Sequence, residues 1–228
     1  MNSFFVFPES RIVDFKIAFW AGLYSGAITS IIVGLVIGII LWQIQKKSEE
    51  REVTRQCERD LSLFVQNLRS YLNRNNIIPI PKGAKEALPT NASRSLYFIN
   101  NNPVNYWIEK LNVSKYPYLS KINEIMKVNL EFENCCHDLD SVLLTKLAEH
   151  YNPRSMNYNL AKEFILLLFV GVKKDDISTW FANLDTNITY QYYEDMLVDT
   201  RINSTLSAFQ HKRTQLLNLL TELRDMLT

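Results

Sequence analysis

Residues 17–45 read IAFWAGLYSGAITSIIVGLVIGIILWQIQ, and no charged residue occurs between Lys16 and Lys46. As a helix, this stretch of 29 residues would be ~43 Å long at ~1.5 Å per residue. The hydrocarbon core of a bilayer is ~30 Å thick and needs ~20 apolar residues, so the stretch can span it with some tilt. The apolar region of a secretory signal peptide is only ~7–15 residues long. We therefore predict an uncleaved transmembrane helix over residues 17–45.

Basic residues are distributed unevenly around this segment. Arg11 and Lys16 precede it, whereas five basic residues follow it closely: Lys46, Lys47, Arg51, Arg55 and Arg59. Cytoplasmic flanks of membrane helices carry an excess of Lys and Arg. The sequence thus predicts a single-pass membrane protein with N-out/C-in topology, in which residues 1–16 form a short extracytoplasmic N-terminus.

Small residues recur every four positions along the apolar segment. The six positions of this small-residue ridge are Ala18, Gly22, Gly26, Ser30, Gly34 and Gly38. Such a ridge lets helix backbones approach closely, and van der Waals packing then drives association in lipid. The ridge rotates by ~40° per step, so the pair Gly22/Gly26 and the pair Gly34/Gly38 face directions about 120° apart. Two faces favour transmembrane packing in a homo-oligomer within the lipid bilayer, although glycines also occur in membrane helices without a packing role.

The chain after the span continues with helical character. Residues 46–74 predict a juxtamembrane stalk helix, because they lack Gly and Pro and their apolar residues recur at helical spacing. Opposite charges on this segment, Glu52 with Arg55 and Arg55 with Glu58, favour the same helix.

A linker and a helical domain follow the stalk. Residues 75–92 contain three prolines and a glycine, which predict a linker with one short turn at 82–88. Residues 93–228 predict the cytoplasmic helical domain, because apolar residues recur at three- and four-residue spacing and no useful alternating strand pattern occurs. The predicted helices cover about 93–101, 104–111, 117–153, 160–172, 175–184 and 187–228, the last broken near Asp199–Asn203. The fold class is all-α: a single N-terminal transmembrane helix followed by a cytoplasmic helical bundle.

The most apolar part of this domain is FILLLFVGV at residues 164–172. Nine residues are too few to span a bilayer. The segment is either a central buried helix or a second membrane-inserting element that becomes exposed on activation, and the charges that bound it favour the buried helix.

The overall charge is nearly balanced, with 25 basic and 24 acidic side chains and a formal net charge of +1. A general nucleic-acid binder usually has a basic footprint, so we expect no direct sequence-specific nucleic acid binding. Only Gly83 and Gly171 lie outside the apolar segment, and no Walker, dinucleotide-binding or nucleophile-elbow motif occurs.

The cysteines and histidines do not suggest a site either. Cys135 and Cys136 are adjacent, so on a helix they point ~100° apart and cannot supply a compact zinc site with His137 and Asp138. We expect Cys136 to be a small core residue and His137 to be exposed. The sequence therefore predicts no catalytic, cofactor-binding or metal-binding residue and favours a protein that is not an enzyme.

One N-terminal span followed by a helical domain resembles the small membrane effectors of bacterial anti-phage defence systems, either retron-type or CRISPR-associated. The resemblance is in architecture, covers the whole chain and assigns no residue a role. It implies an effector of abortive infection that oligomerises through its transmembrane helix and permeabilises the inner membrane when its cytoplasmic domain is triggered. A cytoplasmic protein or ribonucleoprotein partner encoded nearby would supply the trigger. Retron-type effectors are expected to carry two spans, and this chain has one clear span.

Two other functions fit the same sequence. One is a membrane-tethered helical scaffold or signalling adaptor without pore activity, in which the span is only an anchor. The other is an enzyme whose site follows no recognised motif, because an all-α bundle by itself does not determine function.

Overall fold

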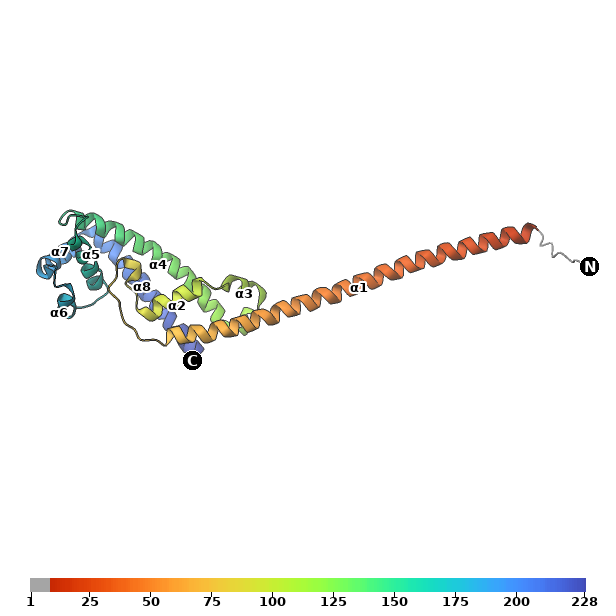
Figure 1. Cartoon of the computed structure of the whole chain (residues 1–228), viewed down its shortest axis with the longest axis horizontal. Coiled ribbons are helices and arrows are strands. Elements are labelled where there is room, and N and C mark those ends of the chain that lie inside the picture. The colour runs from red at the N-terminus through yellow and green to blue at the C-terminus, as the bar shows by residue number, and fades with distance from the viewer. Residues whose placement is uncertain (1–8) are drawn as a thin grey trace, which may run out of the picture. The chain divides into compact units, whose positions relative to one another are not determined.

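The computed structural model describes residues 9–228, so part of the predicted extracytoplasmic segment, residues 1–8, lies outside the described residues. The described chain is all-helical and has no strand within residues 9–228. Its α-helices are α1 (Glu9–Leu72), α2 (Thr90–Asn100), α3 (Val104–Lys110), α4 (Pro117–Ala148), α5 (Met156–Phe169), α6 (Lys174–Ile177), α7 (Thr186–Val198) and α8 (Thr200–Leu227). Three short 3-10 helices, η1 (Ala84–Glu86), η2 (Val113–Lys115) and η3 (Ser178–Phe181), lie in the connections (Figure 1).

The predicted transmembrane helix and the predicted stalk are one continuous helix, α1, which ends at Leu72. The chain divides into two compact units, and the division falls after Gln56, inside the predicted stalk. The first unit consists of α1 up to Gln56. The second unit begins at Cys57 and contains the last four turns of α1 together with all the later helices, which we call the bundle.

Helices α4 and α8 form the centre of the bundle and run antiparallel, side by side (Figure 1). Each has an apolar face at helical spacing, and these faces are buried against each other and their neighbours. The rings of Phe132 on α4 and Phe209 on α8 meet with their centroids 5.5 Å apart, and neither residue is exposed to solvent. Aromatic pairs at this distance stabilise a core beyond the area that they bury.

Helix α5 contains most of the apolar run at residues 164–172. Phe164, Ile165, Leu166 and Leu167 are fully buried, so this run is a central helix of the bundle. Ser155 caps the start of the helix, because its hydroxyl accepts a hydrogen bond from the Tyr158 N–H at 3.2 Å. It ends just before Gly171, whose φ of +90° is a conformation that other residues rarely adopt.

The predicted linker differs from the structure, because much of it is packed into the bundle. Helix α2 already begins at Thr90, and the preceding Ala84, Ala87 and Leu88 are buried. The Ala84 N–H donates to both carboxylate oxygens of Asp140 on α4, at 3.1 and 3.2 Å. The short turn expected at 82–88 is present as η1.

Two smaller expectations concern the C-terminal third. The helix predicted at 175–184 is two shorter helices, α6 and η3, because α6 ends at Ile177 and the chain continues as a 3-10 helix. The break predicted near Asp199–Asn203 is confirmed and lies at Asp199, between α7 and α8. The Asp199 carboxylate accepts hydrogen bonds from the N–H groups of Arg201 and Ile202, at 2.9 and 3.3 Å, and so caps α8.

Candidate membrane-interacting helix

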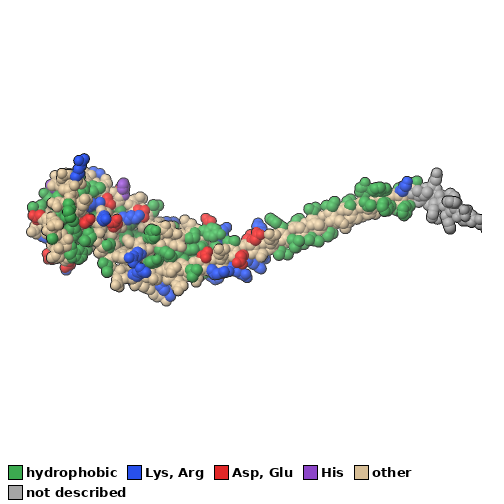
Figure 2. Space-filling view, in the orientation of Figure 1, with side chains coloured by type: hydrophobic (Ala, Val, Ile, Leu, Met, Phe, Trp, Pro, Cys, Tyr) green, Lys and Arg blue, Asp and Glu red, His purple; other side chains and the backbone are tan. Residues whose placement is uncertain are grey.

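The N-terminal part of α1 is a helix with apolar side chains on all sides. Every large apolar side chain from Val13 to Ile44 is 49–70% exposed. Figure 2 shows hydrophobic side chains along this part of α1, with charged side chains near its two ends. Burying one such side chain is worth roughly 1.5–3 kcal/mol, so leaving the whole set in water would cost on the order of tens of kcal/mol. This surface needs an apolar environment.

The length and composition of α1 fit a bilayer. Among the described residues it is the one helix long and apolar enough to cross a membrane, with a mean hydropathy of 2.4 in its most apolar window and none of that window buried. A core helix of a soluble protein would pass the same test on length and hydropathy, but most of it would be buried, as α5 is.

Aromatic side chains lie near both ends of the apolar segment. Phe19 and Trp20 contact each other edge-on at 6.0 Å between ring centroids, and Trp20 packs beside Tyr24 at 6.1 Å. At the other end the Lys46 ammonium lies 5.3 Å from the centre of the Trp42 ring. Trp, Tyr and basic residues at these places are typical of the two interfaces of a membrane helix.

The six residues of the small-residue ridge lie along one i, i+4 row of α1. A Cβ atom added at Gly22, Gly26, Gly34 or Gly38 would meet no atom within 4 Å, so the ridge is open to an approaching helix. The few polar groups nearby are partly satisfied inside the helix, since the Thr29 hydroxyl donates to the Ser25 carbonyl at 2.8 Å. The homo-oligomer remains a prediction.

Charged residues follow the apolar segment at once. The predicted pair is present, with Arg55 Nη1 3.8 Å from Glu52 Oε2. The expected partner of Glu58 is different, because Glu58 Oε1 accepts hydrogen bonds from Lys115 Nζ at 2.9 Å and from the Tyr116 hydroxyl at 2.8 Å. Sequence reasoning could not find this contact, because Lys115 and Tyr116 are more than fifty residues away along the chain.

The last turns of α1 are part of the bundle core. Five buried side chains recur on one face: Cys57, Leu61, Phe64, Leu68 and Leu72. The Phe64 ring stacks on Phe98 of α2 at 5.1 Å and meets Trp107 of α3 edge-on at 5.0 Å. Helix α1 therefore includes both the apolar segment and, from Cys57 on, a face that is buried in the bundle.

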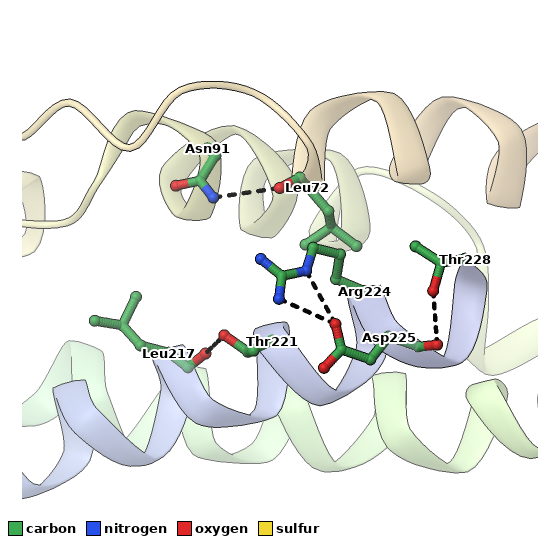
Figure 3. Close-up of polar contacts among 7 residues, drawn as sticks. All are labelled: Leu72, Asn91, Leu217, Thr221, Arg224, Asp225 and Thr228. Atoms are coloured by element: carbon green, nitrogen blue, oxygen red, sulfur yellow. Dashed lines mark hydrogen bonds and ion pairs between the residues drawn. The ribbon is translucent and has the colours of Figure 1, made fainter.

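The C-terminal end of α1 is held by the start of α2 (Figure 3). The Asn91 amide donates to the Leu72 carbonyl at 3.4 Å, which satisfies one of the last carbonyls of α1. Arg224 of α8 reaches the same corner and donates to Asp225 Oδ1 through Nε and Nη2, at 3.1 and 3.0 Å.

We expect the contact at Glu58 to be pH-dependent. The hydrogen bond from Lys115, the one from Tyr116 and the positive charge of Lys115 together lower the pKa of Glu58. A lowered pKa means that the stabilisation is complete above the pKa of the unfolded chain, roughly 4.3, and is lost as the pH falls through the lower folded value. The stability difference between wild type and Glu58→Gln should therefore be largest near neutral pH and vanish under acidic conditions.

Chemical denaturation of the full chain in detergent, followed by far-UV circular dichroism at several pH values, measures this difference. The exposed carboxylate of Glu109 on α3 supplies the control, Glu109→Gln. A Glu58→Gln difference that stays constant with pH would show that the charge of Glu58 plays no part.

The cysteines and histidines are placed as the helical spacing predicts. Cys136 is buried in the α4 face, and burial raises the pKa of its thiol, while His137 is exposed. Among residues 9–228 no group of three or more His, Cys, Asp and Glu side chains is placed to hold a metal ion. Comparisons of the chain with protein-family models, with curated proteins and with solved structures found no match.

Proposed function

We propose that this chain is a membrane-anchored effector of a bacterial anti-phage system. The apolar part of α1 crosses the inner membrane, with its C-terminal side in the cytoplasm, and associates with further copies through the small-residue ridge. A cytoplasmic protein or ribonucleoprotein engages the bundle, and the associated helices then permeabilise the membrane and abort the infection.

The continuity of α1 is the observation that carries this proposal. The same helix presents an uncovered apolar surface from Val13 to Ile44 and a buried face from Cys57 to Leu72. In this proposal, a partner that changes the packing of the second part within the bundle acts on the apolar part through the helix that they share. The assignment to anti-phage defence itself is supported by the architectural resemblance to the small membrane effectors of such systems.

A tethered scaffold or adaptor without pore activity is the second candidate. It is favoured by the scarcity of polar side chains within residues 17–45, where Ser25, Thr29 and Ser30 are the main hydroxyl groups. A water-filled pore needs a polar lining, whereas an anchor does not. An effector with this span would act by disturbing lipid packing.

The two candidates differ in the integrity of the membrane. We would induce the chain in its native host, with and without its neighbouring genes and with and without phage, and follow propidium iodide entry and membrane potential. The effector should admit dye within minutes of the trigger. An intact membrane under every one of these conditions would exclude the effector and leave the adaptor.

The small-residue ridge should be required for association. Replacing Gly22, Gly26, Gly34 and Gly38 by Ile keeps the segment apolar but blocks close approach of backbones. We expect the yield of cross-linked oligomer to fall by about tenfold, equivalent to ~1.4 kcal/mol of association free energy, and dye entry to be lost.

A matched control is available on the same helix. Ala21→Ile adds a bulky apolar side chain on a face away from both glycine pairs and should leave cross-linking unchanged. If the ridge variant cross-links like wild type, the ridge has no packing role and the glycines are incidental.

A further inference from the structure

A groove in the bundle has the features of a small-molecule site. It is lined by residues of α2, α4 and η1 and has a volume of about 390 Å³. All of its walls belong to the unit that begins at Cys57. Small-molecule sites in proteins usually range over roughly 300–1,000 Å³ and combine apolar walls with a few placed polar groups.

The floor of the groove contains a polar side chain in an apolar setting. Asn129 lies on the buried face of α4 and is only 6% exposed. Its Nδ2 donates to Glu133 Oε1 at 3.0 Å, so this amide orientation is set by the hydrogen bond. Its Oδ1 accepts no hydrogen bond from any residue that the structure describes. The fully buried side-chain atoms without a partner among the described residues are Asn91 Oδ1 and Ser95 Oγ, so Asn129 Oδ1 is still reached by solvent from the groove. It is an acceptor that a ligand N–H or O–H group can use in place of water.

The groove has further acceptor oxygens near its rim. Glu133 accepts from Asn129 and forms an ion pair with Lys85 at 2.7 Å, both through Oε1, which leaves its Oε2 free for another donor. The Nδ2 of Asn101 donates to the Tyr97 carbonyl at 2.7 Å, so its Oδ1 can accept a hydrogen bond from a ligand. A ligand that brings several N–H groups would therefore match this wall better than one that brings acceptors.

The shape and the charge of the lining further restrict the kinds of ligand that would fit the groove. Leu88 and Leu96 supply an apolar wall, and the exposed ring of Tyr97 stands at the mouth. These side chains suit the face of a flat ring. The charged groups of the lining are one lysine, Lys85, and two carboxylates, Glu86 and Glu133, so the groove disfavours phosphate groups.

We propose that the groove between α2 and α4 binds a heteroaromatic ring with an exocyclic amino group, of the size and kind of an amino-bearing nucleobase. The amino group donates to Asn129 Oδ1 and Glu133 Oε2, and the ring lies against Leu88 and Leu96. This proposal does not depend on the membrane activity, because the site belongs wholly to the bundle.

Adenosine and purine riboside test the proposal directly, since they differ only in the exocyclic amino group. We would titrate each into the full chain in lipid nanodiscs by isothermal titration calorimetry and by saturation-transfer NMR. Adenosine should bind with a dissociation constant on the order of 0.1 mM, a usual affinity for a ligand of that size. Purine riboside should bind at least about tenfold more weakly, because it cannot donate to Asn129 Oδ1.

Variants of the protein test the same contact from the other side. Asn129→Leu removes the acceptor at nearly constant volume and should abolish adenosine binding, whereas Asn134→Leu, an exposed position on the same helix, should not change it. Ser93→Trp fills the groove from α2 and should also abolish binding, whereas Arg94→Trp beside it should not. The second pair keeps the test valid if Asn129→Leu disturbs the fold.

Three results would overturn the proposal. These are equal affinity for adenosine and purine riboside, wild-type affinity in Asn129→Leu or Ser93→Trp, and absence of adenosine binding at millimolar concentration. Tight binding of butylamine in place of adenosine would assign the groove to aliphatic amines and likewise overturn it. Because none of these measurements involves dye entry, they fail or succeed separately from the proposed membrane function.

Discussion

Replacing Ile32 and Val36 by lysine should release the chain from the membrane fraction. Both positions lie near the middle of the apolar part of α1 and are exposed, at 55% and 51%. A lysine at the centre of a membrane helix costs ~2.5–3.5 kcal/mol, so the pair costs about 5–7 kcal/mol of insertion free energy. That is a change of more than a thousandfold in the partition between membrane and water.

Fractionation of cells followed by a carbonate wash measures this change, with an antibody or a C-terminal tag to follow the chain. The control is Val53→Lys with Leu63→Lys, which adds the same charges at exposed positions of α1 beyond the apolar segment. Retention of the Ile32→Lys/Val36→Lys protein after the wash would mean that residues 17–45 do not cross the bilayer.

Replacing Leu167 by aspartate should unfold the bundle. Leu167 has no exposed surface and sits in the middle of α5, among residues that are also fully buried. A carboxylate there would be desolvated without a partner, which costs at least about 4 kcal/mol. Because domains of this kind are stable by only ~5–15 kcal/mol, a large part of the native stability would be lost.

Thermal unfolding and limited proteolysis of the full chain in detergent detect this loss. Val198→Asp is the matched control, since Val198 is 84% exposed and the same substitution there should shift the unfolding temperature little. The experiment also separates the two interpretations of residues 164–172. If that run were a membrane-inserting element held loosely on the bundle, Leu167→Asp would leave the fold intact and alter only membrane activity.

Much of the helical arrangement could be predicted from local pattern. The faces of α4 and α8 follow from apolar residues at three- and four-residue spacing, which places them on one side of a helix whatever the neighbours are. The break at Asp199 was predictable as well, because a short acidic side chain can cap the N–H groups of the next helix.

Other features could not be predicted, because they depend on partners that are distant in sequence. Residues 75–92 have the composition of a linker, yet Ala84 and Leu88 are buried in the bundle. The Asp140 carboxylate on α4 accepts a hydrogen bond from the Ala84 N–H and so holds this segment against the core. The partners of Glu58 belong to a segment whose position is set by the packing of α3 and the start of α4. Asn129 is part of no motif in the sequence, and only the approach of α2 and η1 to α4 places it in the lining of a groove.

The sequence by itself determined that α1 has an uncharged apolar segment long enough for a bilayer and that the remainder is helical. Composition and periodicity are local properties, and the hydrophobic effect acts on them in the same way in any fold. The tertiary structure alone decided that the last turns of α1 belong to the bundle core, that the 164–172 run is enclosed, and that Asn129 faces an open groove. These depend on which faces meet, and that choice is made by the packing of the whole domain.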